Sequence, residues 1–567
     1  MVERCHKTDS YSLLARCGIA FSLLILAILL FALPQPNLFN VNGFPFLAYF
    51  SLIPVFLLVR FVSWKTVWLW GIAYGVGAYC LFTYWLATFH PMGIFVISFM
   101  YGMYLMLAFL LLKAGASLFP KWGWLAQGVV WCAYDYVKTL GFSGFHYGVL
   151  AYSHWRILPL IQIVDTVGLW GLNALITFTS AWFTGVIVDA YGISQEEAGG
   201  LKTLIKKLPQ ACKKHLVSGC CWLVVFIGVL IYGFVSPIDY TENPQVEVAL
   251  IQQNSDPWVG GISAYQRDLK TLKRLSDEAL TEHPQVDFVV WPETAFVPRI
   301  LWHYQHRYER DKFQLVDDLL HYLDGAPVPF VIGNDHGVDS VGNSVIDYNA
   351  VLFFNPGKNT LPPVPEVYGK MKLVPFTEYF PFDKQFPKLY EMLLNGDTHM
   401  WEPGNEPVVF EVEGNEGATK INFSTPICFE DTFGFVGRRF VNAGAQAFVN
   451  LSNDAWSKSL ACQYQHLSMA VFRSVENRVP TVRATTTGQT CIIDPNGKIL
   501  AMAEPFIETY VVGSIPVMDK SVKTIYTRLG DYVGVIFAVA SGLFLVVGLV
   551  VRCISRKKIK RGLDVLI

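Results

Sequence analysis

Long apolar runs separated by short polar segments fill the N-terminal part of the chain, and one more apolar run lies near the C-terminus. Such runs suit membrane-spanning helices, because a helix needs roughly 20 apolar residues to cross a bilayer. They predict about eight spans, at 17–33, 46–62, 66–88, 94–113, 122–138, 165–189, 217–236 and 531–551. The run at 122–138 is the least typical, because it contains Asp135 and Lys138.

Basic residues gather in every second loop between these runs, whereas loops such as 87–93 contain neither Lys nor Arg. Short loops rich in Lys and Arg stay on the cytoplasmic side of a membrane. All the basic clusters share that side if the N-terminus is cytoplasmic: Lys7 and Arg16; Arg60 and Lys65; Lys113 and Lys121; Lys202, Lys206, Lys207, Lys213 and Lys214; and the tail from Arg552 to Arg561. We therefore expect both termini in the cytoplasm and the region 240–528 outside it. The first run lacks a clear small-x-small cleavage site and precedes further spans, so we expect it to remain as a span.

The composition agrees with a membrane protein. Of 567 residues, 53% are hydrophobic and 16% are charged, whereas soluble domains contain about 25% charged residues. The net charge of −1 gives no indication of a nucleic-acid partner. The 11 cysteines show neither CxxC pairs nor the spacing to histidine that is typical of zinc sites, so we expect no metal and no cofactor.

The region 240–528 has ordinary globular composition, and strand-like and helical patterns alternate along it. Apolar runs predict strands at 246–254, 286–294, 328–333, 348–354, 420–427, 446–451, 480–485, 490–493 and 509–515, and helical spacing marks 265–283, 432–443 and 463–477. This alternation predicts an α/β layered domain with a buried sheet. We therefore expect a membrane domain at 1–239, an inserted domain at 240–528, and a final helix with a basic tail at 529–567.

Three predicted strand ends carry residues suited to nucleophilic chemistry. Glu293 lies in WPET, Lys370 and Glu378 lie in YGKMKLVPFTEYFP, and Cys428 lies in TPICFED. A carboxylate can take the proton of a thiol, and an ammonium can stabilise an oxyanion. Each residue alone has an ordinary explanation, as a solvated cap, an exposed loop charge or a buried cysteine. Their joint occurrence in one α/β domain favours a nucleophilic site.

The same segments resemble a known family. WPETA, KMKLVPFTE and PICFED are similar to the Glu–Lys–Cys triad segments of the nitrilase (carbon–nitrogen hydrolase) superfamily. LVPFTEYFP, NLSNDAW (450–456), QHLSMAVFRSVENRVPTVRATTTG (465–488) and the segment 144–176 narrow the resemblance to the apolipoprotein N-acyltransferase family. The chain departs from that family at Thr377, where Gly is usual, and at Phe429, where Tyr is common. The resemblance covers nearly the whole chain and implies an αββα sandwich inserted before the last span of a polytopic α-helical membrane protein.

The resemblance implies transfer of an acyl chain from a membrane phospholipid to the N-terminal amine of a lipoprotein's diacylglyceryl-cysteine, in a bacterial inner membrane. Cys428 would form a thioester, with Glu293 as the base and ping-pong kinetics as the consequence. Lys370 and the backbone N–H of Phe429 would stabilise the oxyanion. Glu378 and Glu430 would support the lysine and the geometry of the site.

Aromatic residues in loops near the triad segments are candidates for binding the substrate, as a lid or an acyl pocket. They are Trp258, Phe376, Tyr379 and Trp456. Loop packing or a belt at the membrane interface explains them equally well. Two other functions stay open: a membrane-tethered nitrilase-type amidase, and a transporter or receptor with an extracytoplasmic binding domain. The few ionisable residues in the spans, mainly Asp135 and Asp165, make an ion-coupled carrier the weaker alternative.

Overall fold

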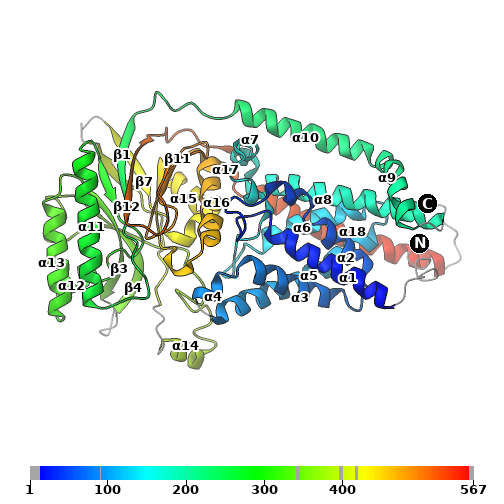
Figure 1. Cartoon of the computed structure of the whole chain (residues 1–567), viewed down its shortest axis with the longest axis horizontal. Helices are drawn as coiled ribbons and strands as arrows, with labels where there is room; N and C mark the ends of the chain where they lie inside the picture. Colours follow the sequence, from blue (N-terminus) through cyan, green and yellow to red (C-terminus); the bar gives the residue numbers. More distant parts are fainter. Residues whose placement is uncertain are drawn as a thin grey trace. The chain divides into compact units, whose positions relative to one another are not determined.

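The computed structural model describes residues 13–89, 91–197, 200–339, 345–394, 400–414 and 419–560. The chain divides into two compact units (Figure 1). A helical unit comprises Met1–Val235 and Asp531–Ile567, and a globular unit comprises Ser236–Gly530. Of the basic residues used to predict the topology, Lys7 and Arg561 lie outside the described residues.

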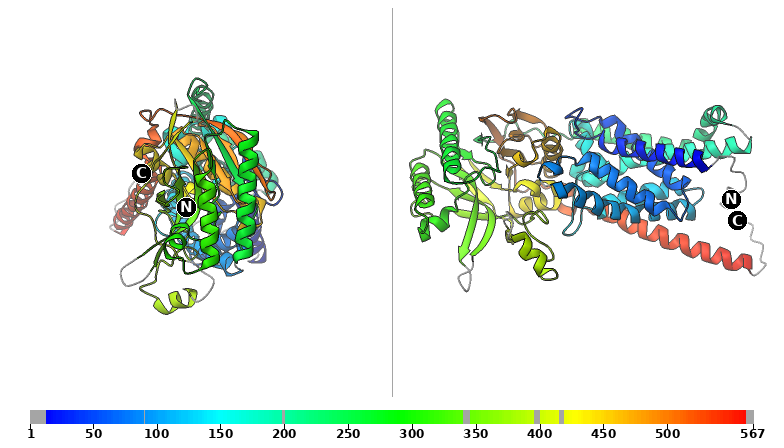
Figure 2. Two further views of the ribbon diagram at one scale, coloured as in Figure 1. Left: turned by 90° about the vertical axis from the view of Figure 1, so that its left-hand side faces the viewer. Right: turned by 60° about the horizontal axis from the view of Figure 1, so that its bottom comes forward.

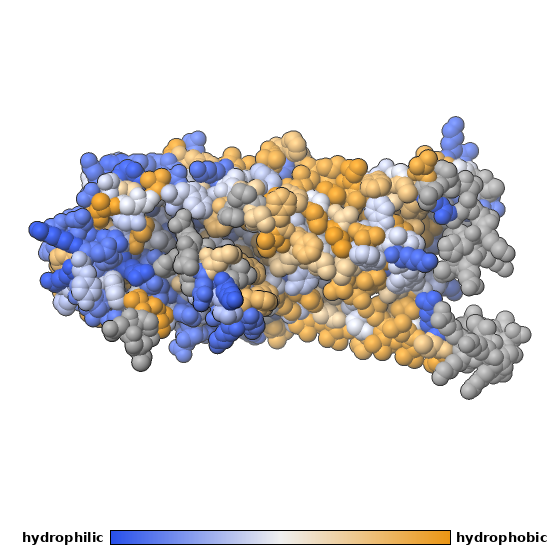
Figure 3. Space-filling model, turned by 90° about the horizontal axis from the view of Figure 1, so that it is seen from below, coloured by the Kyte–Doolittle hydropathy of each residue, from blue (hydrophilic) through white to orange (hydrophobic). Residues whose placement is uncertain are grey.

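The helical unit contains long apolar helices together with shorter ones. Its elements are α1 (Leu13–Ala32), η2 (Pro45–Phe50), α2 (Ile53–Phe61), α3 (Val67–Phe82), α4 (Leu86–Phe89), α5 (Pro91–Leu118), α6 (Gly123–Val137), η3 (Leu150–His154), α7 (Leu158–Ile161), α8 (Val164–Glu196), α9 (Leu201–Lys214), α10 (Leu216–Val235) and α18 (Tyr532–Lys560). Apolar side chains cover much of its surface (Figure 3). An apolar surface of this extent is typical of a protein that is surrounded by lipid.

Within the described residues, five helices are long and apolar enough to cross a membrane, namely α1, α5, α8, α10 and α18. The predicted number of about eight spans is therefore not confirmed. The predicted run 46–62 is divided between η2 and α2, and the run 66–88 is divided between α3, which ends at Phe82, and the short α4. A hydropathy pattern gives the length of an apolar run, but it does not show where a helix ends inside that run.

The α6 helix corresponds to the predicted run 122–138 and is short and largely buried. Its polar residues have partners inside the helical unit. Asn173 Nδ2 donates a hydrogen bond to Asp135 Oδ2 at 3.0 Å, and Lys138 Nζ lies 3.3 Å from Asp135 Oδ1. Pairing lowers the cost of burying these charges, so the helix can pack among its neighbours despite them.

The globular unit contains two six-stranded sheets. The first has the order β12-β1-β2-β3-β4-β5 and the second the order β11-β10-β9-β8-β7-β6. The strands are β1 (Gln245–Gln252), β2 (Phe288–Val290), β3 (Phe330–Asp339), β4 (Val345–Phe354), β5 (Glu366–Gly369), β6 (Phe410–Glu413), β7 (Lys420–Ser424), β8 (Ala447–Ser452), β9 (Thr481–Thr485), β10 (Cys491–Ile493), β11 (Ile499–Met502) and β12 (Thr509–Pro516).

Helices cover the outer faces of the two sheets. The helices of this unit are α11 (Ile262–Glu282), α12 (Ile300–His306), α13 (Arg310–Asp324), α14 (Pro387–Leu394), η4 (Cys428–Thr432), α15 (Gly434–Ala443), η5 (Ala455–Ser457), α16 (Leu460–Asn477) and α17 (Ile525–Leu529). In Figures 1 and 2, α11 and α13 lie side by side against the first sheet, and their leucines form one core with β1, β2 and β3. Aromatic rings join the two sheets: Phe288 of β2 stacks on Phe423 of β7 with ring centroids 5.5 Å apart. The unit is the αββα sandwich that was predicted.

Parallel strands bring the chemically important segments to shared sheet edges. β2 pairs in parallel with β1 and β3, and β7 pairs in parallel with β8. Glu293 follows β2, and Cys428 follows β7. Gly333 on β3 is required where the chain passes Glu293, because a Cβ there would lie 2.3 Å from Pro292 O and 2.7 Å from Glu293 Cα. The fold therefore holds the Glu293 segment tightly against the sheet.

Candidate active site

Cys428 occupies a strained turn directly after β7. It begins η4 with a φ of +47°, in the left-handed region that a residue with a Cβ rarely adopts. Such strain costs on the order of 1–3 kcal/mol and persists only where the surroundings enforce it. Here Glu430 Oε2 accepts a hydrogen bond from the Ile427 backbone N–H at 2.8 Å, and His466 Nε2 lies 3.2 Å from Cys428 O. The half-buried thiol is thus held in one place.

Lys370 follows β5 and is completely buried, with 0% of its surface exposed. Its Nζ donates to Glu378 Oε1 at 2.6 Å and to Glu293 Oε1 at 3.2 Å. Burial lowers the pKa of Lys370, but the carboxylates of Glu293 and Glu378 outweigh it and raise that pKa above its usual value. The side chain is therefore a fixed ammonium inside the site.

Glu293 has hydrogen-bond donors on both carboxylate oxygens. Asn349 Nδ2 donates to Oε1 at 2.9 Å, and the Asn453 backbone N–H donates to Oε2 at 3.0 Å. Glu378 accepts from the Val374 backbone N–H at 2.8 Å, and burial raises its pKa although Lys370 lowers it. The predicted Glu293 and Lys370 are therefore in direct contact, and Glu378 joins them.

The surroundings of Cys428 favour the protonated form of its thiol. Burial, followed by the Glu293 carboxylate, raises the pKa of Cys428 to about 12, while Lys370 and His466 oppose that rise. A thiol of this kind becomes a nucleophile when a base removes its proton as the reaction proceeds. Glu293 is a carboxylate that acts electrostatically on this sulfur and could serve as that base.

Glu430 joins the lysine segment to the cysteine turn without touching the lysine ammonium. Its Oε1 accepts from Tyr368 OH at 2.9 Å and from the backbone N–H groups of Met371 at 2.7 Å and Lys372 at 3.0 Å. Burial raises the pKa of Glu430 to about 7, against the backbone hydrogen bonds that lower it. Glu430 therefore acts on the geometry of the site, by fixing β5 relative to η4.

Phe429 packs its ring against Phe433, with the ring centroids 4.9 Å apart. Among the residues that the structure describes, no acceptor is bonded to its backbone N–H. A free N–H directly after the candidate nucleophile Cys428 is suited to an oxyanion hole. Replacement of Tyr by Phe at this position therefore leaves the backbone donor in place.

The four aromatic candidates lie in the segments that follow β1, β5 and β8. Phe376 and Tyr379 flank Glu378, and the Phe376 N–H donates to Tyr379 O at 2.8 Å. Trp456 lies in η5, close in sequence to Asn453, and Trp258 is 53% exposed. Lys458 Nζ lies 3.7 Å from Asp256 Oδ2, so the loops of these two tryptophans are neighbours. Whether any of them contacts substrate remains a prediction.

Several polar residues at the site were not predicted from the sequence. Asn349 on β4 bonds Glu293 and also lies 3.4 Å from Glu378 Oε1, and Tyr368 on β5 bonds Glu430. A buried asparagine inside the apolar run DYNAVLFF was a usable signal, because unpaired polar groups are costly in such strands. His466 and Asp454 lie in two of the segments that carry the family resemblance, which implied no role for either residue. In the described parts of the chain, no group of three or more His, Cys, Asp or Glu side chains could hold a metal ion.

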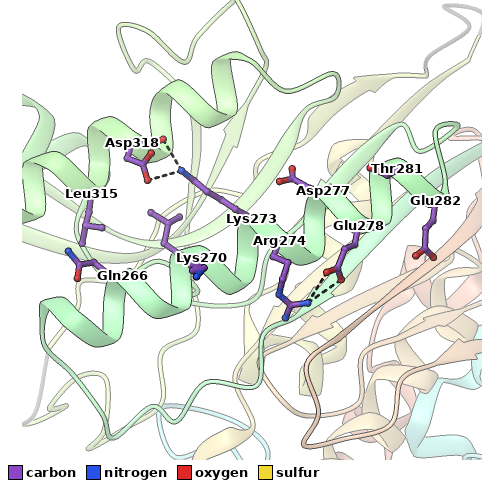
Figure 4. A pocket seen from close by; sticks show the side chains of 11 residues that line it. Gln266, Lys270, Lys273, Arg274, Asp277, Glu278, Thr281, Glu282, Leu315 and Asp318 are labelled. Atoms are coloured by element: carbon purple, nitrogen blue, oxygen red, sulfur yellow. Dashed lines mark hydrogen bonds and ion pairs between the residues drawn. The ribbon is translucent and has the colours of Figure 1, made fainter.

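A separate pocket of about 800 Å³ is lined by residues of α11 and α13 and contains none of these residues (Figure 4). Its lining is mostly charged, and internal ion pairs satisfy much of that charge. Lys273 Nζ lies 2.7 Å from Asp318 Oδ2, and Arg274 Nη1 lies 2.9 Å from Glu278 Oε1. We therefore place the candidate active site at Cys428 and not in this pocket.

Comparison with known families agrees with both units. The N-terminal domain of apolipoprotein N-acyltransferase matches residues 19–182, and the carbon–nitrogen hydrolase family matches residues 247–520. A solved carbon–nitrogen hydrolase from Helicobacter pylori G27 is 13% identical with a TM-score of 0.35, over 51% of this chain and 94% of that one.

Two proteins from Treponema species are similar over almost their entire length. Apolipoprotein N-acyltransferase 1 of Treponema pallidum is 46% identical over 93% of this chain and 95% of its own. Apolipoprotein N-acyltransferase 1 of Treponema denticola is 41% identical over 95% of this chain and 98% of its own. With both family domains present in the same order, this chain belongs to the apolipoprotein N-acyltransferase family, the membrane acyltransferases with a carbon–nitrogen hydrolase domain.

Proposed function

We propose that Glu293, Lys370 and Cys428 are the catalytic triad of this acyltransferase and that transfer proceeds by ping-pong through a thioester on Cys428. The observation that carries this proposal is the buried ammonium of Lys370, which is bonded to Glu293 while both groups act on the Cys428 thiol. A base, a fixed cation and a nucleophile thus meet at one site.

In the first half-reaction the acyl donor is a membrane phospholipid. Glu293 takes the Sγ proton of Cys428 as the sulfur attacks the ester carbonyl. Lys370 and the Phe429 N–H stabilise the oxyanion, each such donor contributing about 3–4 kcal/mol. The ester C–O bond then breaks, and Glu293 returns the proton to the departing lysophospholipid oxygen. An acyl thioester remains on the enzyme.

In the second half-reaction the acceptor is the N-terminal amine of diacylglyceryl-cysteine on a lipoprotein. The amine nitrogen attacks the thioester carbonyl, and Glu293 removes one of its protons. The C–S bond breaks, and that proton returns to the sulfur, so the product amide leaves a regenerated thiol. One covalent intermediate shared by two substrates gives ping-pong kinetics.

The remaining residues have supporting roles in this scheme. Glu378 holds the Lys370 ammonium, and Glu430 fixes the lysine segment against the cysteine turn. We propose that the side chains of Trp258, Phe376, Tyr379 and Trp456 contact the acyl chain or act as a lid over it.

The basic loops support a topology for this scheme. We propose that the region 240–528 is extracytoplasmic, that 1–239 and 529–567 form the membrane part with both termini in the cytoplasm, and that the membrane is a bacterial inner membrane. A catalytic domain outside the cytoplasm would meet both the lipid donor and an exported lipoprotein.

Intact-mass measurement of the purified protein tests the chemistry. Incubation with phospholipid and no acceptor should add the mass of one acyl chain, which hydroxylamine removes. Adding a diacylglyceryl peptide should discharge the adduct onto the peptide amine, whereas discharge only to water would favour the amidase alternative. A Cys428→Ala protein should form no adduct, and an adduct on that variant would refute the assignment of the nucleophile.

A further inference from the structure

Four buried charged side chains from separate segments meet beside the Cys428 turn. They are Asp431 in η4, Asp454 before η5, His466 in α16 and Arg483 in β9. None is more than 4% exposed. The mechanism above uses none of them, although burying so many charges in one place is expensive unless they compensate one another.

His466 has an oxygen atom close to each of its ring nitrogens. Nδ1 lies 2.9 Å from Asp454 Oδ1, and Nε2 lies 2.8 Å from Asp431 Oδ1 and 3.2 Å from the Cys428 carbonyl oxygen. A neutral imidazole has only one N–H, so one lone pair would then point at an oxygen acceptor. Only the imidazolium has two N–H donors and can therefore donate a hydrogen bond to an oxygen acceptor on each side of the ring.

The charges of the cluster balance on this assignment. Arg483 Nη1 contacts Asp431 Oδ2, and Arg483 Nη2 lies 3.6 Å from Asp454 Oδ2. Two carboxylates thus face two cations. In agreement, burial lowers the pKa of His466, but the Asp454 carboxylate and its hydrogen bond outweigh burial and raise that pKa to about 9.

We propose that His466 is a positioning residue for the nucleophile: held as an imidazolium by Asp431 and Asp454, it bonds the Cys428 carbonyl, fixes the left-handed turn and keeps a positive charge beside the sulfur. The inference rests on the proposed role of Cys428. It assigns the thiolate a second cation in addition to Lys370, supplied by helix α16. The effect of His466 on the thiol has the expected sign, because it lowers the pKa of Cys428.

The proposal predicts how fast Cys428 reacts with iodoacetamide, followed by mass spectrometry of the peptide that contains it. Alkylation requires the thiolate, so its rate follows the thiolate fraction. His466→Gln retains an amide donor but loses the charge, and it should slow alkylation at pH 7 to 9 by about tenfold, which corresponds to one pKa unit. As a matched control, Asn477→Ala removes another buried polar side chain of α16 and should leave the rate unchanged.

Asp454→Asn supplies a second measurement that does not require His466 to be replaced. The amide can still accept the Nδ1 hydrogen bond, but without the carboxylate the imidazolium should lose its proton at a lower pH. The alkylation rate of the variant divided by that of the wild type should therefore fall by about three- to tenfold between pH 6 and pH 9. In the wild type the raised pKa of His466, about 9, means that its ring should keep the positive charge over most of this pH range.

A purely structural role gives a different result. A folded His466→Gln protein that is alkylated at the wild-type rate, or a ratio for Asp454→Asn that is flat with pH, would overturn the proposal. The alkylation assay needs no substrate, so its failure is distinct from failure of the proposed function. The latter would appear as acyl transfer by Cys428→Ala.

Discussion

Replacing Lys370 with Met tests whether its ammonium contributes to catalysis beyond its contribution to stability. The ammonium is the hydrogen-bonded partner that Glu293 and Glu378 share, at 3.2 and 2.6 Å, and all three side chains are buried. Removing one member of a buried ion pair costs about 3–5 kcal/mol, because the remaining charge is uncompensated. Removing an oxyanion donor lowers a rate by about 10²–10³. Lys370→Met should therefore lose both stability and rate.

A second substitution separates these two effects. Glu378→Gln removes one of the two carboxylates that the lysine compensates, so in the double variant less uncompensated charge stays buried. Coupling between residues in direct contact is on the order of 0.5–3 kcal/mol, and we expect the double variant to regain that much stability relative to Lys370→Met. The rate of acyl-enzyme formation should stay about 10²–10³ below wild type, because the oxyanion donor is still absent.

The assay combines denaturation of the four proteins of this cycle with the time course of acyl-enzyme mass after phospholipid is added. Glu378→Gln alone completes the cycle and reports the effect of that carboxylate on the lysine. If the double variant recovers its rate in proportion to its stability, Lys370 acts only by holding the site together. The assignment of Lys370 as an oxyanion donor would then be wrong.

Three further outcomes are expected. A reporter fused after residue 236 should be extracytoplasmic and one fused after residue 552 cytoplasmic, and finding both on one side would refute the proposed topology. Cys428→Ser should fold normally but lose most transfer, since a carboxylate is too weak a base for a hydroxyl, whose pKa lies far above that of a thiol in the same surroundings; wild-type turnover by the serine variant would contradict this. Cys462 and Cys491 are buried free thiols, so peptide mapping without reduction should find no bridge between them.

The sequence predicted the layered fold well, because long strands with two buried faces leave a clear pattern. The nine predicted strand segments all contain observed strands, and the predicted helix 265–283 corresponds to α11. The strands missed were β5, β6 and β11, each of four residues. β2 and β10 are shorter still, at three residues each, but all their residues are buried and they lie within apolar runs. Each missed strand instead contains at least one exposed residue, so no fully buried apolar run marks it.

The site was only partly predictable. Glu293, Lys370 and Cys428 could be named because each lies in a distinctive segment, and the contact between Glu293 and Lys370 agrees with that choice. Asn349 lies within an apolar strand, and its importance depends on the register that aims its amide at two carboxylates. Sequence periodicity assigns a residue to one face of a strand, but it does not give its partner across the sheet.

The arrangement at Cys428 explains why the proposed nucleophile needs support from several segments of the chain. The left-handed φ of Cys428 strains its backbone, because the residue has a Cβ. Burial raises the pKa of its thiol and so opposes ionisation. Groups that offset the strain and stabilise the thiolate must stay in place during the reaction, since donors that reorganise would lose much of their electrostatic effect. Lys370, Glu430 and His466 meet that requirement as buried groups with fixed partners. Glu430 belongs to the same motif as Cys428, but Lys370 and His466 come from segments far from it in the sequence, so the reactivity proposed for the cysteine depends on the folded domain and not on its local motif alone.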